Sequence, residues 1–459
     1  MIWPNAARAL ILGCIVMVAS QSSARAEPPN LTLEQRLDAR VTDVYPAQNE
    51  PGLAVLVMVD GKPALRKGYG IADLKAGAKV SPDSIFRIGS ITKQFTAVCV
   101  LQLVQAGKVA LDDPITRYVP GFDTQSKTIT IENLLSHTSG LFNVTARDDY
   151  DDQITKDLTP GEVVALIAGR PLEFEPGTQF KYSNTNYILL GMVIEKASGQ
   201  TYGEYLIEHI GKPLGLTDTR YSRDDALTPR HARGYEKDKS GKWAPAPPLS
   251  MTQPFAAGAI ESTVDDLAKW TAALDEGKLI DPALRDRAWT PFTPTERPSR
   301  YGFGWNIRPE AGERWIGHGG AINGFMSSAV WIPEKKVFVA VLHNALGDTT
   351  PELLVRQLAL EAVGRPAPRR VAITLPAKTL DRYVGVFAVS PEQKFTFSRT
   401  GQKLFVVAPG KTKMALFAEA EGKFFSKEID AQFEFTVEAG KSTQVTITRG
   451  GRSGTASRE

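Results

Sequence analysis

The chain has 459 residues, of which 42% are hydrophobic and 23% charged, so it can form one large domain with additional parts and is not disordered as a whole. Its 54 basic and 51 acidic residues give a formal net charge of +3, which provides no electrostatic reason to expect nucleic acid as a partner. The only cysteines are Cys14 and Cys99, which excludes a disulfide scaffold and a cysteine-based metal site.

Residues 1–26 have the pattern of a secretory signal peptide. Arg8 precedes an apolar run over residues 9–19, and Ala24-Arg25-Ala26 ends the segment. A basic start, a short apolar middle and an A-x-A end are typical of a signal that is cleaved, here after Ala26. We therefore expect a periplasmic or secreted protein, with no membrane span once the signal is removed.

The next part of the chain predicts a domain of the α+β class over residues 27–363. Residues 52–73 alternate as a hairpin that turns at Asp60-Gly61. Helical periodicity dominates from about residue 85 to 290, and strand patterns return at residues 326–332 and 337–343. Strands at both ends indicate an antiparallel sheet flanked by helices, with a helical insert in the middle. The clearest expected helices cover residues 91–103, 188–197 and 263–274.

A change of character follows the proline- and arginine-rich residues 364–370, which we interpret as a solvated linker. Short alternating strands separated by glycine-containing turns predict a small antiparallel all-β module, a barrel or a sandwich, over residues 371–450. The polar tail, residues 451–459, is expected to fray. The expected strands are residues 394–398, 404–407, 414–417, 432–437 and 444–448.

The first motif that could carry out catalysis is Ser90-x-x-Lys93, at the start of an expected apolar helix. Residues three apart share a helix face. A serine hydroxyl needs a base to become a nucleophile, and a lysine lodged in an apolar helix has a lowered pKa and can take a proton. Backbone N–H groups at a helix N-terminus can also stabilise an oxyanion. Taken alone, the motif is more simply an ordinary capped helix start.

Two further motifs have structural explanations when judged alone: a polar turn for the first, and a glycine-rich hairpin with a surface histidine for the second. Tyr182 and Asn184 are two apart, so in extended backbone they point the same way; a phenol beside an ammonium group can act as a general base, and an amide can hold a substrate carbonyl. His318-Gly319-Gly320 leads into the later strand pair. Glycines beside a strand let another backbone approach closely, so a substrate could add there as an extra strand.

The remaining histidines are interpreted as structural. His137 suggests a Ser-His-Asp triad, but no aspartate is singled out to complete it. We expect His137 to form hydrogen bonds that fix its loop, and His343 to lie in the core or at a strand edge. No HExxH and no GxSxG motif is present, so a zinc protease and a nucleophile elbow are excluded.

The three motifs occur in the order S-x-x-K, Y-x-N and H-x-G, and in this order the sequence resembles the serine penicillin-recognising enzymes over about residues 40–360. That group contains class C β-lactamases, D-alanyl-D-alanine carboxypeptidases, D-aminopeptidases and related esterases. The resemblance implies a β-lactamase/transpeptidase-like fold, and residues 371–450 resemble the barrel modules appended to some members. The surroundings that carry it are Phe86–Lys93, Leu111–Pro114, Ile131–Leu141, Pro176-Gly177, Tyr182–Asn184, Gly258 with Ser262, Tyr301–Trp305 and His318–Gly320.

The resemblance also implies a role for each motif. Ser90 would attack the substrate carbonyl and become acylated, and Lys93 and Tyr182 would share the role of base, either one acting in acylation. Asn184 would orient the substrate, and the strand His318–Gly320 would face it. The oxyanion would lie between the backbone N–H groups of Ser90 and Ala321. No metal and no organic cofactor is implied.

The substrate is less closely defined. A lysine at position 318 would attract a carboxylate, whereas His318 is mostly neutral at pH 7, so β-lactam hydrolysis stays open. We expect an exported serine hydrolase acting on a small peptide, amide or ester, with D-amino-acid cell-wall peptides favoured, as in a D-alanyl-D-alanine carboxypeptidase or a D-aminopeptidase. The alternatives are a promiscuous short-chain carboxylesterase, a β-lactamase, or a non-catalytic protein that senses penicillin or peptides.

Overall fold

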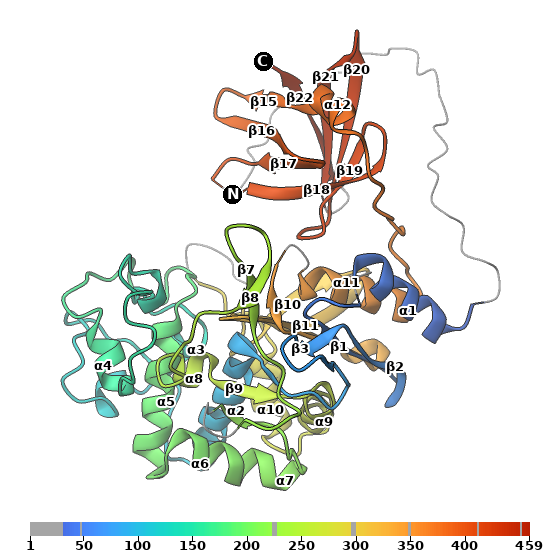
Figure 1. Ribbon diagram of the computed structural model, residues 1–459. Coiled ribbons are helices and arrows are strands. Elements are labelled where there is room, and N and C mark those ends of the chain that lie inside the picture. The colour runs from blue at the N-terminus through green and yellow to red at the C-terminus, as the bar shows by residue number, and fades with distance from the viewer. Residues whose placement is uncertain are drawn as a thin grey trace.

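The computed structural model describes residues 31–45, 48–222, 227–294, 300–347, 350–410, 413–449 and 452–459. The expected signal peptide, residues 1–26, lies outside the described residues. Among the helices that are described, none combines the length and the apolar character needed to cross a membrane. Figure 1 shows a larger domain of helices and strands with a β-barrel above it, which is the two-part organisation that the sequence predicts.

A six-stranded antiparallel sheet is the scaffold of the larger domain. Its order is β10-β11-β12-β13-β1-β2, so the N-terminal strand β1 (Leu53–Val59) pairs with the late strand β13 (Val337–His343), as predicted. The expected hairpin joins β1 to β2 (Lys62–Tyr69) through Asp60 and Gly61, whose φ angles of 49° and 72° suit a tight hairpin turn. The other strands are β10 (Asn306–Glu310), β11 (Glu313–Ile322) and β12 (Phe325–Ile332).

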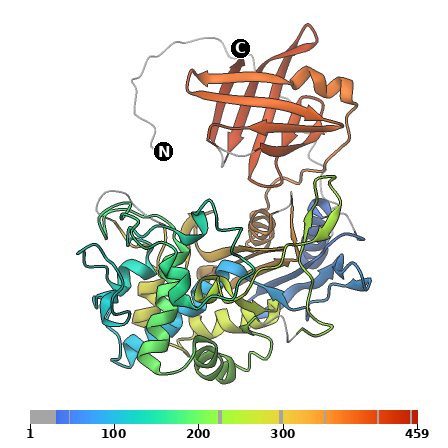
Figure 2. The ribbon, with the colours of Figure 1, turned by 60° about the vertical axis from the view of Figure 1, so that its left-hand side comes forward.

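Both faces of this sheet are covered, because alternate side chains of a strand point to opposite sides. Val55 and Val57 of β1 pack in a cluster with side chains of α1 (Leu33–Val44) and α11 (Pro351–Ala362). Ala54 and Leu56 belong to a second cluster, which the helical insert fills. Figure 2 shows the insert and these two helices on either side of the strands.

The three long helices of the insert correspond to the expected ones: α2 (Thr92–Gln105), α5 (Asn184–Ser198) and α9 (Val264–Asp275). Every side chain of α2 from Thr92 to Leu101 is buried, and Phe95 stacks on Trp270 of α9 with ring centroids 4.1 Å apart. The helix that carries Lys93 is therefore held at the centre of the domain. Shorter helices are α3 (Ile131–Leu135), α4 (Pro160–Ala165), α6 (Tyr202–Leu206), α7 (Lys212–Leu214), α8 (Phe255–Gly258) and α10 (Pro282–Ala288).

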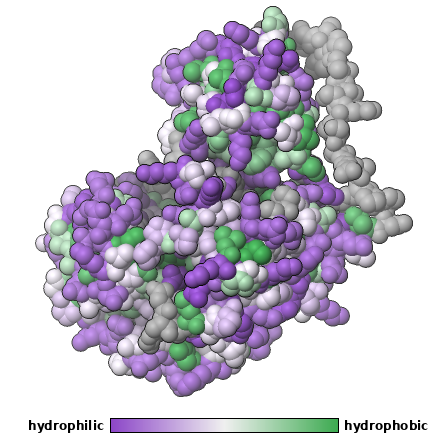
Figure 3. Space-filling model, viewed as in Figure 1, coloured by the Kyte–Doolittle hydropathy of each residue, from purple (hydrophilic) through white to green (hydrophobic). Residues whose placement is uncertain are grey.

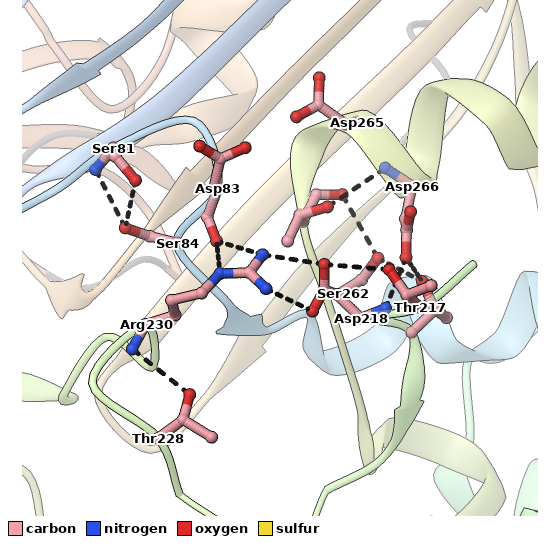
Figure 4. Close-up of polar contacts among 12 residues, drawn as sticks. Ser81, Asp83, Ser84, Thr217, Asp218, Thr228, Arg230, Ser262, Asp265 and Asp266 are labelled. Carbon is pink, nitrogen blue, oxygen red and sulfur yellow. Dashed lines mark hydrogen bonds and ion pairs between the residues drawn. The ribbon is translucent and has the colours of Figure 1, made fainter. Parts of the chain in front are cut away.

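A polar network fixes the loops behind Ser90. The short strand β5 (Phe86–Arg87), just before Ser90, pairs with β9 (Ile260–Ser262). The Thr219 hydroxyl donates to Asp266 at the start of α9 and lies 2.8 Å from Ser262 Oγ. In Figure 4 the Arg230 guanidinium reaches Asp218, at 2.8 Å, and the backbone oxygen of Asp83. These contacts connect α9, β9 and the loop before β5, and so fix the segment that leads to Ser90.

The C-terminal module is a closed barrel of eight antiparallel strands, β15 to β22. Its core is aromatic: Phe435 makes edge-to-face contacts with Phe387, Phe397 and Phe424, and Phe387 makes one with Phe397. All five strands expected from the sequence are present. The barrel consists of β15 (Gly385–Ser390), β16 (Gln393–Thr400), β17 (Lys403–Val407), β18 (Lys413–Ala420), β19 (Lys423–Phe425), β20 (Ala431–Glu438), β21 (Lys441–Arg449) and β22 (Arg452–Arg458), after a short helix α12 (Ala377–Leu380).

The prediction that residues 451–459 fray is wrong. Strand β22 pairs with β21 and with β15 and so closes the barrel. Ala456 is fully buried in the barrel core, whereas Ser453 and Thr455 are exposed. Without β22 the edges of β15 and β21 would lack a partner. In sequence the segment resembles a loose tail, because the one side chain that the described residues 453–459 bury is a single methyl group.

The linker is likewise less solvated than expected. The Arg369 guanidinium forms a salt bridge with Asp43, next to the end of α1, at 2.7 Å. Arg356 of α11 reaches Asp430 of the barrel at 2.9 Å. Ion pairs thus join the barrel to the end of the larger domain that carries α1 and α11 (Figure 1). The face of the molecule in Figure 3 is mostly hydrophilic, with apolar side chains in scattered small patches.

Candidate active site

Ser90 and Lys93 face each other where the expected helix begins. Ser90 lies on a single 3-10 turn, η1 (Gly89–Ile91), which continues directly into α2. Lys93 Nζ lies 3.0 Å from Ser90 Oγ and contacts Asn184 Oδ1 at 2.8 Å and the Ala257 backbone oxygen at 2.7 Å. The Lys93 side chain is completely buried, and this burial lowers its pKa well below the ordinary lysine value.

Because its pKa is lowered, Lys93 can be neutral, and this determines which atom donates in each of its three contacts. A neutral lysine has two N–H bonds and one lone pair. Asn184 Oδ1 and the Ala257 oxygen can only accept, so they take the two N–H bonds. The lone pair is then left for Ser90 Oγ–H, at hydrogen-bond distance. This arrangement suits transfer of the serine proton to Lys93.

Tyr182 completes the group. Lys93 Nζ lies 4.8 Å from the centroid of the Tyr182 ring. In the described part of the chain the buried Tyr182 hydroxyl makes no hydrogen bond of ordinary geometry. Burial raises the pKa of this phenol, and the nearby Ser90 hydroxyl lowers it by less. Tyr182 is therefore a protonated phenol next to the nucleophile, able to donate its proton.

Asn184 begins α5, and both ends of its amide are engaged. Its Oδ1 accepts from Lys93, and its Nδ2 donates to Thr145 Oγ1 at 3.0 Å. The Asn184 backbone N–H donates to Asn143 Oδ1 at 3.0 Å. The residue thus orients the Lys93 amine, and its position is fixed by the loop that contains Asn143 and Thr145.

His318 is held in one neutral form. Its Nδ1–H donates to the Gly319 oxygen at 2.5 Å, so Nε2 accepts from the Tyr301 hydroxyl at 3.0 Å. Burial, and to a smaller extent the charge of Lys93, lower the pKa of His318 to about 4. The ring lies 6.1 Å, centroid to centroid, from Tyr182. His318 consequently offers no positive charge to a substrate near pH 7.

Two glycines allow the end of β11 to approach Ser90. A Cβ on Gly320 would lie 2.1 Å from the Ile88 backbone oxygen, and a Cβ on Gly89 would lie 2.9 Å from the Ala321 backbone nitrogen. Gly89 also has a φ of +50°, which few other residues adopt. Because both positions lack a side chain, the Ala321 backbone lies against the turn that carries Ser90. This is the close approach that the predicted oxyanion site requires.

A cavity of about 210 Å³ opens beside Ser90. Three segments form its walls: the loop from Thr145 to Ile154, residues 249–258, and the end of β11 from Ala321 to Asn323. His318 and Gly319 line a different cavity of about 400 Å³, together with Arg300. The two cavities share no lining residue, and the second is bounded mostly by residues on the α11 face of the sheet, among them Trp315, Val330 and Val355.

The structure therefore brings all the predicted site residues together. Ser90, Lys93, Tyr182 and Asn184 form one group, and His318–Ala321 passes along it. Reasoning from sequence missed Thr145 and Asp151 of the cavity wall, since nothing in their loop distinguishes them from other polar residues. Tyr301, the hydrogen-bond partner of His318, was included only as part of the segment Tyr301–Trp305 that carries the family resemblance, and no role was predicted for it.

The α+β domain and a serine one helical turn from a buried lysine define the class of serine hydrolases related to β-lactamases and penicillin-binding proteins. The chain belongs to the β-lactamase family: the family model described as Beta-lactamase matches residues 33–364. A model described as a domain of unknown function (DUF3471) matches residues 369–454, the barrel.

Individual relatives agree with this placement. Protein flp of Staphylococcus aureus (strain MW2) is 30% identical over 331 residues, which cover 70% of this chain and 65% of that protein. The octameric penicillin-binding protein homologue of Pyrococcus abyssi has 28% identity and a TM-score of 0.69, covering 92% of this chain and 99% of that one. The D-amino acid amidase of Ochrobactrum anthropi SV3 has 26% identity and a TM-score of 0.61, covering 72% and 98%.

Proposed function

We propose that the protein is an exported hydrolase that cleaves amide or ester bonds through an acyl-enzyme on Ser90, with D-amino-acid-containing peptides or amides as the favoured substrates. The observation that carries the proposal is the 3.0 Å contact between Ser90 Oγ and the buried Lys93 amine, whose pKa is lowered. The similarity to a D-amino acid amidase supports the substrate class, and the pattern of residues 1–26 supports export.

In acylation, Lys93 is the base. It takes the Ser90 proton while Oγ forms a bond to the substrate carbonyl carbon, and the resulting oxyanion is stabilised by the backbone N–H groups of Ser90 and Ala321. When the tetrahedral intermediate collapses, the bond to the leaving group breaks. Tyr182 donates its proton to that group and regains one from the Lys93 ammonium. The proton that Tyr182 carried thus leaves with the product, and the proton removed from Ser90 replaces it on Tyr182.

Deacylation reverses the direction of the relay. A water molecule replaces the leaving group and gives a proton to the Tyr182–Lys93 pair as its oxygen bonds to the acyl carbon. The ester bond to Ser90 then breaks, and Oγ recovers the proton. The raised pKa of Tyr182 and the lowered pKa of Lys93 support this division, in which lysine is the base and tyrosine the relay.

The test is a substrate panel on the wild type and on Ser90→Ala. It contains D-phenylalanine amide, a peptide ending in D-alanyl-D-alanine, a p-nitrophenyl ester and a chromogenic cephalosporin. We expect the wild type to turn over at least one substrate, with a mass increase on Ser90 equal to the acyl group, and the variant to be inactive. Equal turnover by both proteins would contradict the proposal, as would a cephalosporin adduct without turnover of any substrate.

A further inference from the structure

We propose that Asp151 binds the free α-ammonium group of the residue that acylates Ser90, so that the protein acts on amides, peptides or esters of unblocked amino acids. This inference rests on the proposed function and specifies its substrate class. Asp151 lines the 210 Å³ cavity that opens beside Ser90. The size of that cavity suits the acyl part of a single amino acid better than a long chain.

The position of the proton donor decides which part of the substrate enters this cavity. The leaving group receives its proton from Tyr182, and the Tyr182 ring lies beside that of His318, with the ring centroids 6.1 Å apart. Neither Tyr182 nor His318 lines the cavity with Asp151. The leaving group therefore departs on the His318 side, and the acyl part occupies the Asp151 side.

The charge of the acyl-side cavity selects an ammonium group. Among the described residues that line it, Asp151 is the only carboxylate, and there is no lysine or arginine. Lys93 does not line the cavity, and its Nζ is engaged by Ser90, Asn184 and the Ala257 oxygen. A cationic group is thus attracted to this cavity, whereas a carboxylate there would meet the negative charge of Asp151 without a cation to balance it.

The Asp151 carboxylate is also available for binding. In the part of the chain that the structure describes, no ion pair or hydrogen bond engages its side chain, whereas the neighbouring Asp149 pairs with Arg147. The loop itself is fixed: the Gln253 side chain, which also lines the cavity, donates to the backbone oxygens of Gln153 and Lys156. The Asp151 carboxylate is therefore unpaired and lies on a loop whose position is fixed.

The experiment compares D-alanine p-nitroanilide with its N-acetyl derivative at pH 6.5, where an α-amino group with a pKa near 8 is charged. We expect the wild type to prefer the free amine, and Asp151→Asn to lower the ratio of the two kcat/KM values about tenfold, the size of one charged hydrogen bond. Raising the salt from 50 to 500 mM should lower the wild-type ratio, because Asp151 is exposed.

Asp152→Asn is the matched control, because Asp152 is an exposed neighbour that does not line the cavity, and it should leave the ratio unchanged. A ratio that Asp151→Asn does not alter, in a variant with wild-type melting temperature, overturns the inference. So does a wild type that cleaves neither anilide although a p-nitrophenyl ester acylates Ser90, and in that case the proposed acyl-enzyme chemistry still stands. If no substrate acylates Ser90, the proposed function itself is wrong.

Discussion

His137 Nδ1 accepts a hydrogen bond from the backbone N–H of Ser183, with 3.2 Å between the two nitrogens. Ser183 stands between Tyr182 and Asn184, so this one bond fixes the segment that carries both site residues. Asn186 Nδ2 lies at the same distance from His137 Nδ1, and the His137 ring packs on that of Tyr182 with centroids 4.3 Å apart. His137 is a positioning residue, in agreement with the structural role expected from the sequence.

Replacing His137 by Phe should therefore lower both stability and turnover. The ring contact with Tyr182 is kept, but the buried Ser183 N–H loses its acceptor, which costs about 1–3 kcal/mol. We expect the free energy of unfolding in urea to fall by that amount and kcat to fall about tenfold, with a smaller change in KM, because Tyr182 is displaced from Ser90. His209 is exposed, and His209→Phe should leave kcat unchanged. An unaltered kcat in His137→Phe would contradict the positioning role.

Gly320 and Gly319 provide a matched pair. A Cβ at position 320 would meet the Ile88 oxygen at 2.1 Å and Ser327 Oγ at 2.4 Å, whereas one at position 319 has its nearest neighbour at 3.5 Å. Gly320→Ala should push β11 away from the Ser90 turn, with a loss of about 1–3 kcal/mol in stability and at least about a hundredfold in kcat through the displaced oxyanion N–H. Gly319→Ala should keep wild-type stability in the same urea titration. Equal stability of the two variants would show that β11 does not approach Ile88 this closely.

The sequence predicted the local part of this arrangement well. Ser90 and Lys93 share a helix face whatever the rest of the chain does, and the hairpin at Asp60-Gly61 follows from local alternation and turn chemistry. The approach of Gly320 to Ile88 joins residues far apart in the chain, and only the family resemblance suggested it. Asp151 reaches the cavity through a loop held by long-range hydrogen bonds, for which no periodic pattern exists.

Lys93 should make the protein less stable than a Lys93→Met variant as the pH falls. Burial lowers the pKa of Lys93 in the folded chain, so below the unfolded value near 10.5 the unfolded chain binds a proton that the folded chain lacks. Wild-type stability therefore decreases as the pH falls from about 10.5 toward the folded pKa, while methionine has no such dependence. The melting temperature of the variant minus that of the wild type should be larger at pH 7 than at pH 10. The variant should also lose about 10²–10⁴-fold in kcat, as for removal of a general base.

Buried histidines should make the protein sensitive to acid. Burial lowers the pKa of His343 to about 4, and burial together with Lys93 lowers that of His318 to about 4. Since the unfolded values lie near 6.5, the unfolded chain takes up protons that the folded chain does not, and stability is lost as the pH falls from 6.5 toward 4. Each group contributes up to about 3 kcal/mol over this window. His343→Leu, measured by urea unfolding at pH 7 and pH 4.5, should show the smaller loss; an equal loss would exclude His343 as a contributor.

The sequence did not predict the last strand of the barrel, β22, and its role in closing the barrel can be tested. Ala456 of β22 is fully buried opposite Val445 of β21, whereas Thr455 is exposed. Ala456→Asp would place a carboxylate in an apolar core, which costs several kcal/mol unless the strand detaches. We expect the variant to be cut by trypsin within residues 371–449, as detected by mass spectrometry, while the fragment that contains residues 33–364 persists and still hydrolyses a p-nitrophenyl ester.

Thr455→Asp is the matched control for the same charge on the same strand. Its side chain faces solvent, so the barrel should resist trypsin as the wild type does. Equal resistance of the two variants would mean that β22 does not close the barrel and that the segment frays after all. Equal sensitivity would mean that the charge weakens β22 from either face, so burial of Ala456 would not be what holds the strand in place.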